Sequence, residues 1–95
     1  MQFLVIVRVL ETAVGPDDAR VRRELGPAIQ RILASGKIAA SGTFAGIRCG
    51  FFLINVDAPE DIFTTLGKVI IENFHVDIYP TMPFAKLSEV FAMYD

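Results

Sequence analysis

Two stretches of this chain are apolar in both phases of a β-strand, and this pattern restricts the fold more than any other. Residues 2–10, QFLVIVRVL, and residues 49–56, CGFFLINV, are rich in β-branched and aromatic types. A strand with one face in water carries polar residues at every second position. These two strands therefore predict a sheet that is covered on both faces.

Two helices are expected between the strands. Apolar residues recur at helical spacing after Pro16, and again after the stretch DAPEDIF at 57–63. Both begin with a proline and acidic residues, which favour the positive end of a helix. Proline inside a helix removes a backbone hydrogen bond, so Gly26-Pro27 predicts a kink or two short helices in the first. The buried stripe predicted for the second comprises Ile62, Phe63, Leu66, Val69 and Ile70.

The other elements complete a β-α-β-β-α-β order. We expect a weaker strand at 38–46, a turn at 46–48, a fourth strand at 73–80 and a short amphipathic tail helix at 85–94. This order is the ferredoxin-like split βαβ pattern, an α+β fold, here as one domain over residues 1–95. The topology gives a four-stranded antiparallel sheet in the order 4-1-3-2, with both helices on one face.

The second face of that sheet is apolar as well, and this predicts self-association. Of the residues, 53% are hydrophobic, yet no apolar run approaches the ~18 residues of a membrane-spanning helix. Face-to-face pairing of two such sheets makes a barrel shared by two subunits. We therefore expect a homodimer or a higher homo-oligomer, in which the tail helix packs on a neighbouring subunit or over a sheet edge, and no membrane partner.

Charge and cysteine content exclude several classes of function. The formal net charge is −2, without a basic patch to follow phosphates, so we expect no nucleic-acid partner. A single cysteine, Cys49, excludes an internal disulfide and a cysteine-pair metal site. No signal segment is recognisable at the start of the sequence, and together these features favour the cytoplasm.

Two segments resemble a known group of proteins. Residues 41–66, SGTFAGIRCGFFLINVDAPEDIFTTL, and 73–82, NFHVDIYPTM, are similar to sequences of the dimeric α+β barrel superfamily. The resemblance is to muconolactone isomerase-like proteins and to a related bacterial family of unknown function. It implies the dimeric barrel fold and small-molecule chemistry without a cofactor. Its motifs are structural, so it assigns no catalytic residue.

Polar residues on the fourth strand suggest a site. In NFHVDIYP, His75, Asp77 and Tyr79 share one face, and Arg8 and Asn55 on the neighbouring strands join them if the faces of those strands coincide. Such a set suits a small acidic or carbonyl-bearing ligand. Arg8 and Asn55 would bind it, with Arg8 paired to its carboxylate. His75 would move a proton, assisted by Asp77, while Tyr79 would donate to a developing oxyanion.

A simpler interpretation stays open beside this one. His75 and Asp77 are then strand residues in water, and Arg8 belongs to an ordinary ion pair. Cys49 follows a basic residue at a strand start, but free cysteine is among the most buried residue types, so we interpret it as structural. One histidine without a cysteine pair makes no recognisable metal site. We expect no cofactor; haem, which a lone histidine binds in some barrel proteins, has no support in the sequence.

Two hypotheses for the function follow. The first is a cofactor-free isomerase-like enzyme that transfers protons on a small organic acid or lactone. The second is a non-catalytic module for small-molecule binding or assembly. The enzyme requires His75 or Arg8 to face an enclosed cavity, whereas the binding module requires a cavity without a titratable pair inside it.

Overall fold

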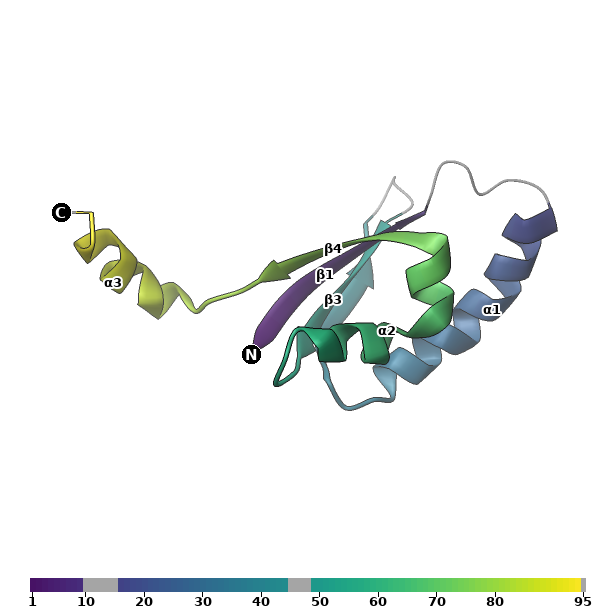
Figure 1. The fold of residues 1–95 in the computed structure, drawn as a ribbon, viewed down its shortest axis with the longest axis horizontal. Coiled ribbons are helices and arrows are strands. Elements are labelled where there is room, and N and C mark those ends of the chain that lie inside the picture. The colour runs from purple at the N-terminus through teal and green to yellow at the C-terminus, as the bar shows by residue number, and fades with distance from the viewer. Residues whose placement is uncertain (10–15, 45–48, 95) are drawn as a thin grey trace.

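The structure, a computed structural model, describes residues 1–9, 16–44 and 49–94, and it has the α+β order expected (Figure 1). Leu10, the end of the second predicted strand and the turn at 46–48 lie outside the described residues. The elements are β1 (Gln2–Val9), α1 (Pro16–Leu33), β2 (Ile38–Thr43), β3 (Cys49–Asn55), α2 (Glu60–Asn73), β4 (Phe74–Pro80), the 3-10 turn η1 (Phe84–Lys86) and α3 (Leu87–Ala92).

The described strands form one antiparallel sheet of four strands in the order β2-β3-β1-β4, which reads 4-1-3-2 from the opposite edge. β1, the most apolar strand, lies inside the sheet between β3 and β4. Opposite residues include Val5 with Phe52 on β3 and Val5 with Ile78 on β4. α1 and α2 lie on one side of these strands (Figure 1). We call the opposite side the open face.

The hydrophobic core fills the space between the sheet and the two helices. Alternate residues of β1 and β3 point into it, as the pleat requires, and α1 and α2 supply the opposite wall. Its fully buried side chains are Val5, Ile32, Ile54, Ile62, Leu66 and Ile70. Burial of one such side chain contributes roughly 1.5–3 kcal/mol, so these residues dominate the stability of the fold.

The helices differ from the sequence-based expectation at two glycines. α1 runs as one helix through Gly26 and Pro27. Arg23, whose carbonyl loses its partner at Pro27, is exposed along with Pro27, so solvent can hydrate that carbonyl. The interruption occurs instead in α2, at Gly67, whose φ of 81° and ψ of 175° are not helical. Only glycine adopts this backbone conformation readily.

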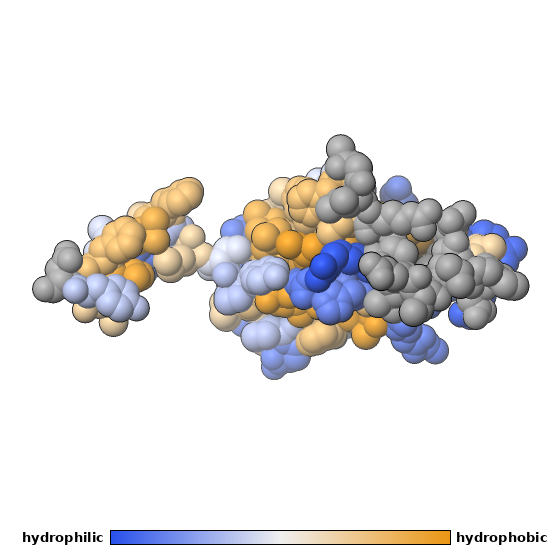
Figure 2. All heavy atoms as spheres, turned by 90° about the horizontal axis from the view of Figure 1, so that it is seen from above, coloured by the Kyte–Doolittle hydropathy of each residue, from blue (hydrophilic) through white to orange (hydrophobic). Residues whose placement is uncertain are grey.

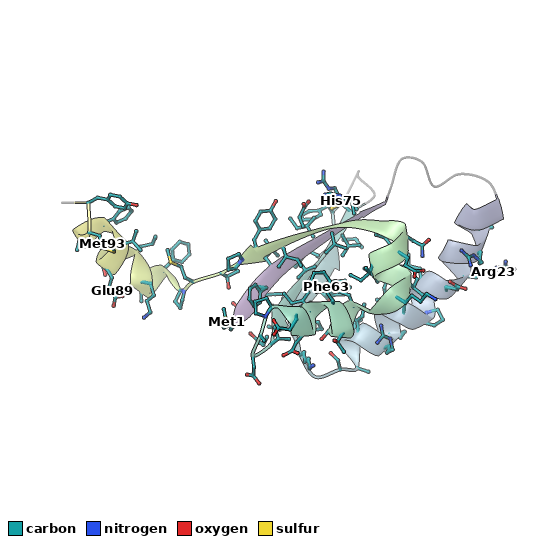
Figure 3. The ribbon with its side chains drawn as sticks, viewed as in Figure 1. Met1, Arg23, Phe63, His75, Glu89 and Met93 are labelled. Carbon is teal, nitrogen blue, oxygen red and sulfur yellow. The ribbon has the colours of Figure 1, made fainter. Side chains whose placement is uncertain are left out.

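The buried stripe of α2 is narrower than predicted. Ile62, Leu66 and Ile70 are buried as expected, but Phe63 is 51% exposed. Figure 3 shows Phe63 on the helix side of the strands. Thr65, which the predicted stripe did not include, is buried, and its hydroxyl donates to the Asp61 carbonyl oxygen at 2.8 Å.

The C-terminal segment extends away from the rest of the molecule. η1 and α3 contribute no buried residue, and Figures 1 and 2 show them apart from the sheet in both views. Their large apolar side chains are accordingly exposed, namely Phe84, Phe91, Met93 and Tyr94. Within the described ranges, no helix is both long and apolar enough to cross a membrane.

Adjacent isoleucines of α2 provide a test of this packing. Ile70 is 1% exposed and Ile71 is 38% exposed. We expect Ile70→Ala to lower the free energy of unfolding by about 2–5 kcal/mol, since it leaves a cavity in the core. Ile71→Ala should lower it by less than about 1 kcal/mol. Urea denaturation followed by circular dichroism measures both. Equal losses from the two substitutions would contradict the assigned core face.

Candidate functional site

The strand register places all five predicted site residues on the open face. Arg8 lies opposite His75, with Asp77 and Tyr79 following along β4 opposite Ile6 and Leu4. Asn55 lies opposite Gln2 at the other end of β1. Residues directly opposite each other in an antiparallel pair share a face of the sheet. Figure 3 shows His75 on the side of the strands away from α2.

Arg8, His75 and Asp77 form a connected polar cluster. The Arg8 Nη2 atom donates to Asp77 Oδ2 at 2.7 Å, and His75 Nε2 lies 3.0 Å from Asp77 Oδ1. Asp77 thus binds one partner with each carboxylate oxygen. Its side chain is 26% exposed, whereas those of Arg8 and His75 are 55% and 52% exposed. The carboxylate is therefore the fixed centre of the cluster, and its partners reach outward.

The two partners set the charge state of Asp77. Partial desolvation, the largest single effect, would raise the pKa of this carboxyl group. The hydrogen bonds from Arg8 and His75, together with their charges, act in the opposite direction and prevail, so the pKa of Asp77 lies below its ordinary value of 3.8. Asp77 is therefore a carboxylate throughout the neutral range and can orient the imidazole ring.

Tyr79 and Asn55 do not belong to this cluster. At a rise of ~3.4 Å per residue, Tyr79 stands about 7 Å beyond Asp77 and about 14 Å from His75. Asn55 is farther away, about 20 Å along β3 from Cys49, the residue opposite Arg8. It borders a separate small hollow with Lys37, Asp57 and Asp61. The sequence placed the five residues on one face, but the structure brings only three of them together.

The surroundings of the cluster are apolar. Leu4 and Ile6 of β1 and Phe51 and Leu53 of β3 lie on the open face and are half-buried. Figure 2, which views the molecule from this side, shows a compact polar patch with apolar atoms beside it. Arg8 and His75 are more than half exposed, and among the described residues neither lines the small hollow beside Asn55 or the larger one beside α1. An enclosed site on this face requires a second surface over it.

The cluster is suited to proton transfer. Because the Asp77 carboxylate accepts hydrogen bonds, it favours the imidazole tautomer with the proton on Nε2, which leaves Nδ1 of His75 to accept a proton. Arg8 uses one of its donors on Asp77 and retains others for an anionic ligand. Cys49 is buried at the start of β3 and lies opposite Arg8. Among the described residues, no group of three potential ligands is arranged to hold a metal ion.

A second feature, which the sequence did not reveal, lies on the helix side of the sheet. A half-open hollow of about 310 Å³ separates α1 from the end of the sheet, where Gly42 and Gly50 leave little side-chain bulk. Its wall is almost wholly apolar and includes Val7, Leu25, Ile29, Phe52, Ile70 and Phe74. Except for Cys49 at its margin, none of the described residues lining it is titratable. In the sequence, apolar periodicity identifies these residues as core. It cannot show that they leave a space between them after folding.

Comparisons with known proteins supply no family or relative from which a function could be assigned. No protein-family model matches the chain, and no curated protein matches it.

The Asp77 cluster predicts a pH dependence of stability. Because the pKa of Asp77 is depressed in the folded state, its stabilising effect is complete above the ordinary value of 3.8 and is lost as pH falls through the folded value. We expect Asp77→Asn to be less stable than the unmodified protein at pH 7, and the difference to shrink at pH 3. Urea denaturation at both pH values measures it. A difference that is unchanged at pH 3 would show that the pairing is absent in solution.

Proposed function

We propose that this chain is a ferredoxin-like domain of the dimeric α+β barrel type and forms a homodimer through the open face. The observation that carries the proposal is the Arg8–Asp77–His75 cluster set within an apolar sheet surface. A second sheet packed on this surface would bury Leu4, Ile6, Phe51 and Leu53 and would enclose the cluster. A free cysteine is compatible with a reducing compartment, and we place the protein in the cytoplasm.

In this dimer the enclosed cluster acts as a cofactor-free isomerase site for a small organic acid or lactone. Arg8 binds the carboxylate of the substrate. His75 Nδ1 removes a proton from a carbon beside a carbonyl, and the C–H electron pair moves onto the carbonyl oxygen as an enolate. The same nitrogen returns the proton to another carbon of the conjugated system. Protons and electrons balance within the substrate, and Tyr79, about 14 Å away along the strand, has no step.

The arrangement of the charged groups supports this assignment over an ordinary surface ion pair. An exposed ion pair contributes little to stability, and only Asp77 is largely shielded here, at 26% exposure. Here the carboxylate has a fixed position between two partners that remain accessible to a ligand. Exclusion of water by a second sheet would strengthen the interactions of both partners with a bound anion.

Two variants test the proposal with muconolactone as the probe. Hydrogen exchange of the lactone in D₂O, followed by NMR, reports proton abstraction without assuming the product. We expect His75→Gln to remain a dimer and to lose about 100-fold or more of the exchange rate, since the base is removed. Leu53→Arg should lose both exchange and dimerisation, because it places a charge at the centre of the open face.

The matched control is Leu33→Arg, which adds the same charge at a position that is 42% exposed on α1. It should retain exchange and a light-scattering mass near twice the 10.5 kDa of one chain. A mass near 10.5 kDa for the unmodified protein would contradict the dimer. A dimer that exchanges no proton of the lactone would contradict the catalytic assignment for this substrate.

The apolar hollow supports a second candidate function, a non-catalytic binding module. Ligand pockets in proteins typically start near 300 Å³ and are mostly apolar, which fits the hollow between α1 and the sheet. A wall without a titratable pair gives it no group for acid–base chemistry. The ligand class that fits is a small neutral hydrocarbon or aromatic molecule, and the protein would bind it without changing it.

Binding of N-phenyl-1-naphthylamine, a neutral apolar dye, tests this candidate by fluorescence titration. Leu25→Trp fills the hollow, so saturable dye binding should be abolished. Leu33→Trp adds the same side chain at an exposed position of the same helix and should leave binding unchanged. Equal dye binding by the two variants would place the dye elsewhere on the protein.

A further inference from the structure

α2 is built as two helical segments that meet at Gly67. The non-helical conformation of Gly67 ends the first segment at Leu66. A helix end leaves backbone carbonyl groups without helical partners. One of these is satisfied from α1, because Arg31 Nη2 donates to the Leu66 carbonyl oxygen at 2.8 Å. A side chain of α1 therefore satisfies a carbonyl group at the break in α2.

The fit between Arg31 and Gly67 is tight. The positive φ of Gly67 favours glycine, and the Arg31 guanidinium occupies the space that a methyl group at this position would enter. The carbonyl that Arg31 binds belongs to a residue whose side chain is fully buried in the core. Arg31 thus ties α1 to a residue of the core.

Several side chains of α1 besides Arg31 contact the core. Ala28 and Ile32 are buried, and they lie within one turn of Arg31. Leu25 and Ile29 are half-buried; they pack against the core and line the hollow. Figure 1 shows the N-terminal half of α1 reaching beyond the sheet.

The hollow of about 310 Å³ lies beside the core, between α1 and the sheet. Leu25 and Ile29 of α1 line it and also pack against the core, so the position of α1 sets the width of the hollow.

We propose that Arg31 is a positioning residue that fixes α1 as one wall of the apolar hollow and thereby sets the size of ligand the hollow accepts. This inference rests on the binding function suggested for the hollow. The hydrogen bond from Arg31 to the Leu66 carbonyl oxygen holds α1 against α2, and with it the position of Leu25 and Ile29 in the wall.

The test compares Arg31→Met with Arg20→Met, which removes an exposed arginine of the same helix. Two readouts are used: the dissociation constant for N-phenyl-1-naphthylamine and amide hydrogen exchange of peptides from α1. For Arg31→Met we expect dye binding to weaken about tenfold, the size of effect produced by loss of one hydrogen bond from a charged group. Exchange should accelerate across residues 23–30 and stay unchanged in β1 and β3. Arg20→Met should match the unmodified protein.

Arg31→Lys is the conservative variant, since lysine can donate one hydrogen bond to the Leu66 carbonyl. It should restore part of both effects, and it keeps the test decisive if Arg31→Met does not fold. Exchange that accelerates equally in α1 and in the sheet, or in neither, would overturn the positioning role. Failure of the unmodified protein to bind the dye would overturn the binding function alone, because exchange in α1 still reports on Arg31.

Discussion

The presence of apolar side chains on both faces of β1 and β3 is the constraint on which the rest of this molecule depends. One face is covered by α1 and α2, and the buried residues of the core lie there. The other is left half-buried within the described part of the chain, with Leu4, Ile6, Phe51 and Leu53 along it. Apolar surface of this extent costs free energy in water. The proposed dimer follows from that cost.

The two candidate sites stand on opposite sides of the same sheet. Val7 lines the apolar hollow, and Arg8, the next residue, belongs to the polar cluster. The pleat sends adjacent side chains to opposite faces, so one strand serves two environments of different chemistry. The cluster contains a histidine that is oriented by a carboxylate and an arginine with further donors for an anion. The hollow is an apolar space without charged groups among the described residues that line it. Cys49 and Phe51, whose partners on β1 are Arg8 and Ile6, also line the hollow, so the two sites adjoin at the start of β3.

The contact between Arg31 and the break in α2 shows how a helix defect can be matched by a distant residue. Gly67 frees backbone carbonyls that a continuous helix would have satisfied internally. Arg31, which lies 35 residues before Leu66 in the sequence, donates a hydrogen bond to the Leu66 carbonyl oxygen. Gly26-Pro27 is the more conspicuous irregularity in the sequence, yet α1 is continuous there. The position is exposed, so water can hydrate the carbonyl group that loses its hydrogen bond to the proline. The cost of an irregular residue thus depends on what lies beside it after folding.

The sequence alone determined the order of strands and helices and the phase of the side chains along each strand, because period-2 and period-3.6 patterns are local properties of the chain. That is why His75, Asp77 and Tyr79 were expected on one face, which Arg8 and Asn55 would share if the faces of the neighbouring strands coincide. Tertiary structure decided their distances: the register brings Arg8 opposite His75 and leaves Asn55 opposite Gln2. It also decided that Phe63 is exposed and that α1 stands off the sheet, since both depend on contacts between segments that are far apart in the sequence.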